Sequence, residues 1–200
     1  MKDKQAMDQP KSSAAKRRWV FVMEPERCID CEACMVSCSV ENVVPLGQHR
    51  NWIVKIDKGA YPNLSTTYLP ENCHHCSNPP CERVCPTGAT YRREDGLVLI
   101  DYDKCIGCKY CMMACPYDAR FVNEEKKAVD KCTFCVHRLD VGLPPACVET
   151  CIGHARHFGD INDPNSEVSK LLAKHPYYRL YEEAGSEPAI YYIYSNRVID

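Results

Sequence analysis

Short apolar runs separated by polar and charged residues set the secondary structure expected for this 200-residue chain. The five apolar residues at 19–23 end at Glu24, and such a run predicts a buried strand behind a short basic tail. The segment 89–105, ATYRREDGLVLIDYDKC, predicts a β-hairpin that turns at 94–96, around an Asp-Gly pair. No run approaches the roughly 18 uncharged apolar residues that a membrane-spanning helix requires. The chain is thus expected to have no membrane span of its own.

Toward its C-terminus the chain is expected to form one helix and a tyrosine-rich tail. Asp163 and Pro164 are typical of a helix cap and first helical position, apolar residues at 168, 171 and 172 share one face, and Pro176 ends the helix. The tail 175–195 holds six of the 12 tyrosines, and rings with polar tips suit interfaces; a plain edge strand is the alternative. The insertion 39–72 contains Trp52 and is expected to form two strands that face a partner.

Charge and motifs exclude several classes of function. The formal net charge is −2, the basic segment 16–18 is too short for a nucleic-acid surface, and no phosphate-binding glycine loop or catalytic triad is present. Arg17 and Arg18 are similar to a twin-arginine export signal, but the apolar run behind them is short and no small-residue cleavage site follows. Residues 1–18 are therefore expected to be a flexible basic tail without a targeting signal.

The cysteine content is unusually high: 16 of the 200 residues are cysteine, a level that indicates disulfides or bound metal. The cysteines fall into four groups of four with none left over. Group one is Cys28, Cys31, Cys34 and Cys38; group two is Cys73, Cys76, Cys81 and Cys85; group three is Cys105, Cys108, Cys111 and Cys115; group four is Cys132, Cys135, Cys147 and Cys151.

Three chemistries compete for these groups. Eight disulfides would need an oxidising compartment, and cysteines two residues apart rarely bridge. Zinc sites seldom run three C-x₂ steps together and then add a fourth cysteine before proline, although a zinc-stapled interaction scaffold is a rival hypothesis. The bacterial ferredoxin spacing C-x₂-C-x₂-C-x₃-C-P is matched fully by group three, CIGCKYCMMACP, and by group one with Ser39 in place of the proline. The spacing therefore predicts iron–sulfur clusters.

The fourth cysteine of a group is expected to serve a different cluster from the first three. Three closely spaced thiolates can surround one cuboidal cluster, whereas the fourth lies about a helical turn further on and faces away. Each cluster then takes three ligands from one group and one from another, which predicts four [4Fe–4S] clusters in two exchanging pairs. Because four thiolates and a [4Fe–4S]²⁺ core carry −2, the clusters would move the formal charge from −2 to about −10.

Repeated segments indicate which groups pair. The hairpin at 89–105 joins groups two and three into one unit. The segment 18–28, before group one, resembles 96–105, and the segment 155–161, after group four, corresponds to the strand that follows group two. Groups one and four therefore supply the two strands of a second hairpin. The predicted ligand sets are Cys28, Cys31, Cys34 and Cys151 for cluster 1; Cys38, Cys132, Cys135 and Cys147 for cluster 2; Cys73, Cys76, Cys81 and Cys115 for cluster 3; and Cys85, Cys105, Cys108 and Cys111 for cluster 4. Pairing group one with two, and three with four, stays open on this argument.

From Trp19 onward the chain resembles the four-cluster iron–sulfur subunit of the polysulfide, thiosulfate and dimethyl sulfoxide reductase family, and most of all the polysulfide reductase subunit. The motifs that carry the resemblance are CSNPPCERVCPTGA, CPYDAR and KCTFCVHRLDVGLPPACVETC, which are specific for the subunit type and weak for the substrate. Ser39 and Ile152 depart from the inner unit, where Pro86 and Pro116 follow the fourth cysteines, but no ligand is lost.

The resemblance implies a subunit that makes no chemistry of its own and relays electrons between a molybdopterin catalytic subunit and a quinone-reactive membrane subunit. It also implies the nested wiring, four-iron clusters throughout and a tail that wraps a partner. The alternatives are a free-standing polyferredoxin carrier and the iron–sulfur subunit of a quinone-linked complex that reduces no sulfur compound. The expected place is the periphery of the cytoplasmic membrane, on the periplasmic face after co-export with a partner or else on the cytoplasmic face.

The expected fold is α+β, with two nested ferredoxin-like modules related by a pseudo-twofold axis, a partner-facing insertion, and a C-terminal helix with an extended tail. The outer module comprises 19–60 and 125–165, the inner module 61–124, and the C-terminal helix and docking tail 166–200. Lys109 is expected to be a solvated loop lysine. The histidines expected to pack around the clusters rather than to ligate iron are His74, His75, His137, His154 and His157.

Overall fold

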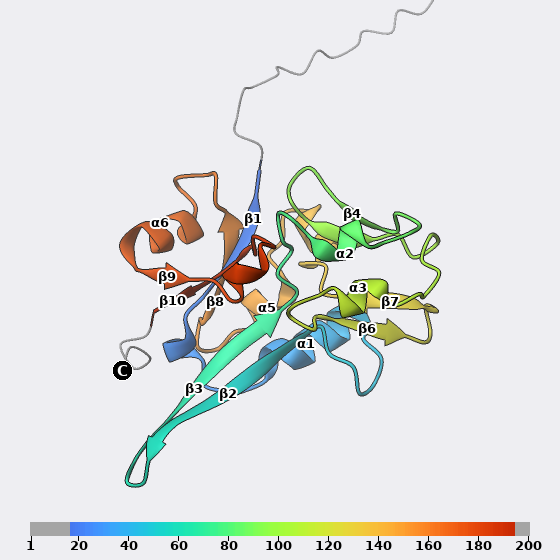
Figure 1. The fold of residues 1–200 in the computed structure, drawn as a ribbon. Coiled ribbons are helices and arrows are strands. Elements are labelled where there is room, and N and C mark those ends of the chain that lie inside the picture. Colours follow the sequence, from blue (N-terminus) through green and yellow to red (C-terminus); the bar gives the residue numbers. More distant parts are fainter. Residues whose placement is uncertain (1–16, 195–200) are drawn as a thin grey trace, which may run out of the picture.

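The computed structural model describes residues 17–194, which form short helices and small sheets (Figure 1). The strands are β1 (Trp19–Met23), β2 (Asn51–Ala60), β3 (Asn63–Asn72), β4 (Thr90–Arg92), β5 (Val98–Ile100), β6 (Arg120–Asn123), β7 (Ala128–Lys131), β8 (Arg156–Asp160), β9 (Tyr177–Tyr178) and β10 (Ile190–Ile193). The α-helices are α1 (Ala33–Asn42), α2 (Pro80–Arg83), α3 (Tyr110–Met113), α4 (Val136–Leu139), α5 (Ala146–Glu149) and α6 (Glu167–Lys174), and the 3₁₀ helices are η1 (Pro25–Arg27) and η2 (Glu182–Ala184).

The largest sheet brings together the two ends of the described chain, in the strand order β8-β1-β10-β9. β1 runs antiparallel to β8, with Trp19 opposite Asp160 and Met23 opposite Arg156. The predicted pairing of 18–28 with 155–161 is thereby confirmed. β10 lies parallel to β1 on its other side, so β1 is a central strand, and its apolar run is buried on both faces.

Two short hairpins form the inner part of the fold. β4 and β5 pair Thr90 with Ile100 and Arg92 with Val98, which confirms the predicted hairpin with its turn at 94–96. The second hairpin, β6–β7, joins group three to group four, and the sequence pattern does not indicate it. Gly96 in the first turn has a φ of +88°, and a Cβ atom there would collide with the guanidinium of Arg18, so the turn requires glycine.

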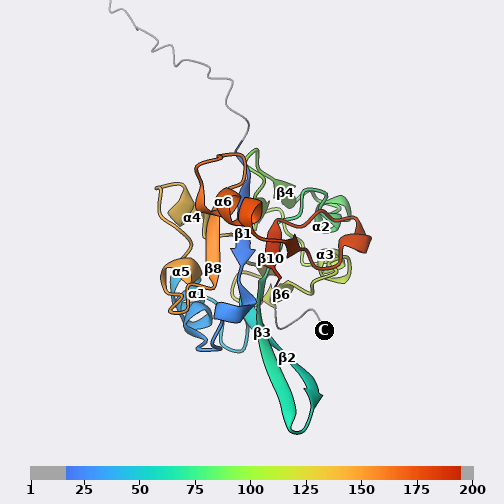
Figure 2. The ribbon, with the colours of Figure 1, turned by 90° about the vertical axis from the view of Figure 1, so that its left-hand side faces the viewer.

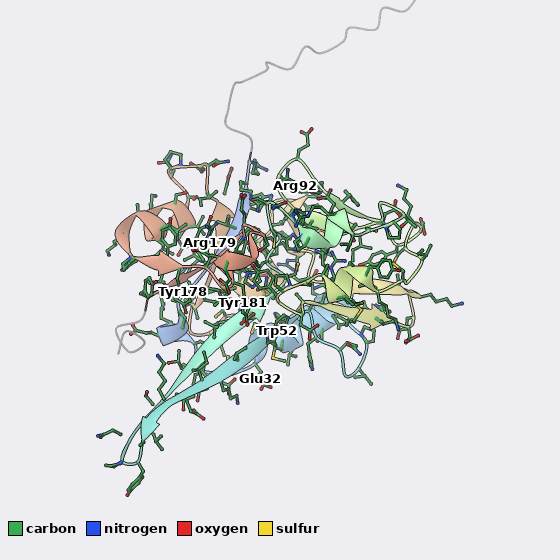
Figure 3. All side chains as sticks on the ribbon, in the orientation of Figure 1. Glu32, Trp52, Arg92, Tyr178, Arg179 and Tyr181 are labelled. Atoms are coloured by element: carbon green, nitrogen blue, oxygen red, sulfur yellow. The ribbon has the colours of Figure 1, made fainter. Side chains whose placement is uncertain are left out.

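The insertion forms a long two-stranded arm, β2–β3, that projects from the body of the molecule (Figure 1, Figure 2). Its register runs from Asn51 opposite Asn72 to Ala60 opposite Asn63, which confirms the two strands predicted in 39–72. Trp52 lies at the base of the arm, where the arm leaves the body (Figure 3). At the other end, Tyr61 is 89% exposed, so the outer part of the arm packs against nothing in the described part of this chain.

The core is a cluster of aromatic rings between the main sheet and the cysteine loops. Phe134 of group four packs edge-on against Phe21 of β1, with ring centroids 4.8 Å apart, and against Phe158 of β8 at 5.5 Å. On its other side Phe134 contacts the ring of His75 in group two at 3.7 Å. Because loops of the outer and inner groups meet on the same rings, the two modules share one core.

Helix α6 begins later than the sequence predicts. Asp163 does not cap the helix; its Oδ1 accepts from the backbone N–H of Asn165 in the preceding turn. The N-cap is Ser166, whose Oγ accepts from the backbone N–H of Ser169 at 3.2 Å. The helix ends at Lys174, two residues before Pro176, as predicted. No helix among residues 17–194 is long and apolar enough to cross a bilayer.

The tyrosine-rich tail packs into the protein's own sheet over its described part. β10 lies between β1 and β9, so the tail supplies an interior strand as well as the edge strand β9. Tyr192 is fully buried, and its hydroxyl donates to the carbonyl of Pro70 in the arm at 3.2 Å. Tyr178, Arg179 and Tyr181 lie together where the tail crosses the body (Figure 3), and Tyr181 is 52% exposed. Residues 195–200 and 1–16 of the expected tails lie outside the described residues.

Candidate metal centres

Four hollows in the structure are each lined by four cysteines, and no cysteine lines two of them. Site 1 is lined by Cys28, Cys31, Cys34 and Cys151; site 2 by Cys38, Cys132, Cys135 and Cys147; site 3 by Cys73, Cys76, Cys81 and Cys115; site 4 by Cys85, Cys105, Cys108 and Cys111. The four are alike in size, with atom-free spaces between 270 and 330 Å³. Each site draws three cysteines from one group and one from another, so the structure brings together the same four sets that the sequence predicts.

The loops curl around the hollows through residues in the left-handed region of φ. The second residue after the first cysteine has a positive φ in every group: Asp30 at +55°, His75 at +41°, Gly107 at +67° and Phe134 at +54°. Only glycine adopts this conformation without steric cost. A non-glycine residue there costs of the order of 1 to 3 kcal/mol and persists where the surroundings enforce it. The repeated placement shows that all four loops are built to turn their sulfurs inward.

Most of the thiols are shielded from water, which opposes their ionisation. Burial raises the pKa of Cys38 to about 11 and the pKa values of Cys76 and Cys147 to about 12. Since the thiolate is the form that ligates metal, these groups need positive charge at the hollow to ionise near neutral pH. A coordinated metal supplies that charge and deprotonates a thiol outright.

Backbone N–H groups already point at several of the sulfurs. The N–H of Ala155 donates to Cys151 Sγ at 3.2 Å, and that of Thr90 donates to Cys85 Sγ at 3.4 Å. Both acceptors are fourth cysteines of their groups, just after the short helices α5 and α2. These donors favour the charged form of sulfur, and they are the kind of contact by which a protein sets a cluster's potential.

The donor set fits a cuboidal cluster better than a single ion. Within residues 17–194, no group of three or more histidine, cysteine or acidic side chains is arranged to hold one metal ion. Instead, four thiols surround each hollow. Four thiolates around such a space are the ligand set of [4Fe–4S], which supplies one-electron chemistry when it is bound.

His74, His75 and His157 occupy buried packing positions, whereas His137 and His154 are exposed, contrary to the expectation for those two. Both nitrogens of His75 are used: Nδ1 accepts from the N–H of Val98 at 3.0 Å, and Nε2 contacts the carbonyl of Cys132 at 2.9 Å. His74 stacks on the ring of Tyr117 with centroids 3.7 Å apart. His137 pairs with Glu41, and His157 lies between two carboxylates. Burial lowers the pKa of His74 and His75, so both rings at site 3 are neutral near pH 7.

Sequence reasoning misses three buried arginines at the hollows. Arg50 lines site 2, Arg120 lines sites 3 and 4, and Arg156 lines site 1. A signal for two of them exists in the sequence, because CPYDAR and CIGHAR both place an arginine five residues after the fourth cysteine of a group. Lys109 is exposed, as expected.

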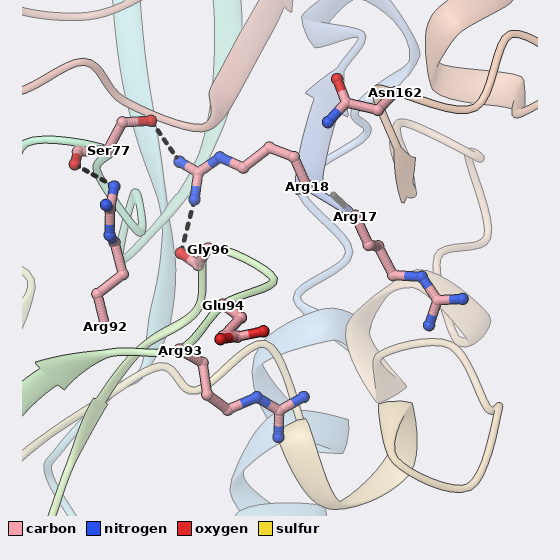
Figure 4. Close-up of a pocket in the computed structure, with 8 residues that line it drawn as sticks. All are labelled: Arg17, Arg18, Ser77, Arg92, Arg93, Glu94, Gly96 and Asn162. Carbon is pink, nitrogen blue, oxygen red and sulfur yellow. Dashed lines mark hydrogen bonds between the residues drawn. The ribbon is translucent and has the colours of Figure 1, made fainter. Parts of the chain in front are cut away.

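A further hollow, larger than the four cysteine-lined ones, lies at the junction between the start of β1 and the β4–β5 turn (Figure 4). It is lined by Arg17, Arg18, Ser77, Arg92, Arg93, Glu94, Gly96 and Asn162. Arg18 donates to the carbonyls of Gly96 at 2.6 Å and His75 at 2.8 Å, so it ties β1 to the inner hairpin. Arg18 therefore belongs to the folded body rather than to the flexible tail expected at 1–18.

Comparison with known proteins assigns the chain to a family. Residues 64–161 and residues 27–89 each match a family described as a 4Fe-4S dicluster domain. The chain is 46% identical to a subunit of the tetrathionate reductase of Salmonella typhimurium, over 89% of its own length and 73% of that protein. It is 41% identical to a subunit of the selenate reductase of Mesobacillus selenatarsenatis, covering 88% and 72% of the two chains. It is 42% identical to a subunit of the sulfite dehydrogenase of Allochromatium vinosum, covering 86% and 81%.

The two matched segments together span all four cysteine groups, and the relatives cover most of the described chain. Two dicluster domains require sixteen ligands, which is the number of cysteines in the sequence. The chain therefore carries four [4Fe–4S] clusters and belongs to the family of iron–sulfur electron-transfer subunits that work within multisubunit reductases.

Proposed function

We propose that this chain relays electrons through its four [4Fe–4S] clusters between a molybdopterin-type catalytic subunit and a quinone-reactive membrane subunit. The proposed ligands of each cluster are the four cysteines that line sites 1 to 4. The observation that carries the proposal is that every hollow is built from two groups, in an outer pair (sites 1 and 2) and an inner pair (sites 3 and 4).

The sites follow one another in the order 1, 2, 3, 4. Cys34 of site 1 and Cys38 of site 2 lie one helical turn apart on α1. His75 lines site 3, and its Nε2 contacts the carbonyl of Cys132 at site 2 at 2.9 Å. Sites 3 and 4 share the lining residue Arg120. These contacts between successive sites support a path with sites 1 and 4 at its ends.

Both ends of this path reach the surface. The two exposed cysteines are Cys31 of site 1 and Cys108 of site 4, whereas the other fourteen are buried or half-buried. Exposed apolar side chains accompany each of them. The chain segment that contains Cys31 exposes Ile29, Val36, Val40, Val43 and Leu46, which we call the end-1 patch, and the segment that contains Cys108 exposes Ile106, Tyr110 and Met113, the end-4 patch. Because exposed apolar side chains lie on both segments, we infer one protein partner at each end.

The arm supports the same arrangement. Ile53 and Pro70, on its two strands, line site 1, so the arm extends the end-1 surface outward from the cluster nearest to it. We propose that the insertion faces a partner there. Two separate docking ends favour a relay that joins two partners over a free-standing polyferredoxin carrier, which needs only one face for its exchange of electrons.

We further propose the nested division into an outer module at 19–60 and 125–165, an inner module at 61–124, and a C-terminal helix and docking tail at 166–200. Within the family, we propose that the chain is nearest to the subunits of the polysulfide, thiosulfate and dimethyl sulfoxide reductases, and to the polysulfide reductase subunit above all. The relatives named above act, by their names, on tetrathionate, selenate and sulfite. The proposed place is the periphery of the cytoplasmic membrane, on its periplasmic face.

Double substitution of cysteines tests the ligand sets. A fully assembled chain holds about 16 iron atoms, four in each cluster. Cys31→Ala with Cys151→Ala removes two ligands of one proposed cluster, so about 12 iron atoms are expected to remain. Cys135→Ala with Cys151→Ala removes one ligand from each of two clusters, so about 8 are expected. Reversed counts, about 8 and about 12, or equal iron loss in these two variants, measured after anaerobic purification, would show that Cys151 does not complete site 1.

The partners are tested by the size of the native assembly. Anaerobic size-exclusion of the protein from its own cells is expected to place it in a complex with a molybdopterin subunit. Elution near its own mass of 22.8 kDa would instead favour the free-standing carrier.

A further inference from the structure

Two buried arginines occupy equivalent places in the outer and inner pairs of sites. Arg120 begins β6, five residues after Cys115, and Arg156 begins β8, five residues after Cys151. Their exposed fractions are 4% and 3%. Because each follows the fourth cysteine of a group, each lies where the chain passes from one site of a pair to the other.

Both guanidinium groups have an unused donor. Nη1 of Arg120 donates to the hydroxyl of Thr90 at 3.3 Å, and Nη1 of Arg156 donates to the amide oxygen of Asn72 at 3.1 Å. The Nη2 atoms of both residues are buried and have no hydrogen-bond partner. Within the described part of the chain, neither arginine forms an ion pair with a carboxylate. Each is thus a buried positive charge whose oxygen acceptor is a neutral side chain.

Two other buried cations show that this pattern is specific. Arg50 at site 2 is neutralised by Asp130, to whose two oxygens its Nη2 donates at 2.8 and 2.9 Å. Lys131 is fully buried, but its Nζ donates to the backbone carbonyls of Val98 and Cys132, and it lines none of the four sites. Among residues 17–194, only Arg120 and Arg156 combine burial, a charge without a carboxylate and a free Nη2 donor at a cysteine-lined hollow.

The negative charge that each arginine meets comes from the cysteines of two sites. Arg120 itself lines sites 3 and 4. Arg156 lines site 1, and the side chain of Asn72, which accepts from its Nη1, lines site 2. Each arginine therefore lies between the two sites of one pair.

A buried, unpaired cation costs several kcal/mol unless an anion lies against it. A [4Fe–4S]²⁺ core with four thiolates carries −2, and its sulfur atoms accept hydrogen bonds. Two neighbouring clusters would therefore supply both the negative charge and the hydrogen-bond acceptor that each arginine lacks. We propose that Arg120 and Arg156 are the fixed counter-charges of the cluster pairs, each donating from Nη2 to sulfur at its sites and raising the reduction potentials of both clusters of its pair. Arg120 serves the clusters of sites 3 and 4, and Arg156 those of sites 1 and 2.

The direction of the effect follows from charge balance. Each site takes up one electron from its donor and changes from −2 to −3, with no bond formed or broken. A positive charge held within hydrogen-bonding distance stabilises the −3 state more than the −2 state, so its removal makes reduction harder. The assignment of each arginine to a pair of clusters rests on the ligand sets proposed above.

Redox titration of the complete complex, monitored by electron paramagnetic resonance, tests the proposal. Arg120→Gln is expected to lower two midpoint potentials and Arg156→Gln the other two, each by at least a tenfold change in the equilibrium constant for reduction, about 59 mV for one electron. Arg120→Lys, which keeps the charge, is expected to restore more than half of the shift. Lys170→Gln on the exposed face of α6 removes one charge far from the sites and is expected to leave all four midpoints unchanged.

The possible outcomes distinguish a failure of the counter-charge proposal from a failure of the proposed ligand sets. Unchanged midpoints in a fully assembled Arg120→Gln variant, or equal shifts in the Gln and Lys variants, overturn the counter-charge role. Shifts that fall on only one cluster of each pair overturn the claim that each arginine serves both clusters, whereas the ligand sets are tested separately by the iron counts above. If the Gln variants do not assemble, wild-type protein with ¹⁵N-labelled arginine decides: a nitrogen hyperfine coupling to reduced clusters is expected, and its absence from every cluster refutes the hydrogen bonds.

Discussion

Asp130→Asn is the sharpest test of how the cysteine loops are held in place, because one buried carboxylate joins several of the segments that carry them. Asp130 on β7 is 1% exposed and lies two residues before Cys132. The side chains that donate to its oxygens are Arg50 (2.8 and 2.9 Å), Tyr102 (2.8 Å), Asn123 (3.1 Å) and Lys126 (3.1 Å). Arg50 comes from the start of the arm and Tyr102 from the loop before group three, so the network reaches sites 2 and 4.

The magnitude follows from the charge that asparagine removes. Burial alone would raise the pKa of Asp130, but these donors, with Arg50 first among them, lower it from 3.8 to about 2. This lowering of the pKa corresponds to roughly 2 to 3 kcal/mol of preference for the ionised form in the folded state. Asparagine also leaves the guanidinium of Arg50 buried without a counter-charge, and breaking a buried pair in this way costs about 3 to 5 kcal/mol. We expect the total loss to lie within that second range.

The sign of the pH dependence is fixed by the same values. A carboxyl group whose pKa is lower in the folded state stabilises that state above its ordinary pKa, and the contribution is lost as the pH falls through the folded value. The full difference between the wild type and the variant is therefore expected above about pH 4 and shrinks toward pH 2.

The assay is the rate at which the visible cluster absorption is lost in anaerobic urea, since a cofactor-bound protein does not unfold in two states. A loss of 3 kcal/mol corresponds to a rate roughly 100-fold faster when the clusters escape from a transiently opened state. Asp57→Asn is the matched control, because Asp57 accepts from Thr66 on the exposed arm. A variant at position 130 that loses its clusters within threefold of the control would refute the reasoning.

Four further substitutions test the core, a helix end and the docking patches. Phe134→Ala removes a fully buried ring at the centre of the aromatic cluster and is expected to cost about 3 to 5 kcal/mol, seen as faster cluster loss, whereas Tyr61→Ala at the exposed tip of the arm should have no effect. Ser166→Ala removes the N-cap of α6 and is expected to cost about 1 kcal/mol, with Ser65→Ala on the exposed arm as the control; an unchanged rate would mean that the cap contributes nothing. Val40→Glu and Met113→Glu place a charge in the end-1 and end-4 patches, and each is expected to weaken co-purification with one partner only while the iron content stays unchanged. If either variant releases both partners, or neither variant releases any, the two-ended docking scheme is wrong.

Much of the architecture is readable in the chain because the cysteine spacing and the strand signals are local. The apolar run at 19–23 and the Asp-Gly turn of 89–105 are enough to predict β1 and the β4–β5 hairpin, since a strand and a tight turn depend on a few neighbouring residues. The match between 18–28 and 96–105 also predicts the contact of β1 with β8, more than a hundred residues apart. Since 96–105 pairs with the strand after group two, its copy at 18–28 is expected to pair with the corresponding strand after group four.

Weaker local signals led to the errors. Asp163 and Ser166 are both good helix caps, and only the packing of Val168 against the main sheet fixes where α6 starts. The tail at 175–195 is expected to be an interface or an edge strand; β9 is an edge strand, Tyr192 packs against the arm and the main sheet of the same chain, and the contact with a partner stays a prediction. The sequence contained no sign of β6–β7, whose strands are only four residues each.

The sequence by itself determined the cofactor chemistry, because the number and spacing of thiols decide which inorganic core they can hold, and that information lies within a few residues of each cysteine. Only the tertiary structure decided how charge is distributed around the cores. In the motifs CPYDAR and CIGHAR nothing distinguishes Arg120 and Arg156 from other arginines. Folding buries both side chains and leaves them without a carboxylate partner. Burial and the absence of a partner are properties of the whole packed chain, since they depend on every segment that closes over the side chain.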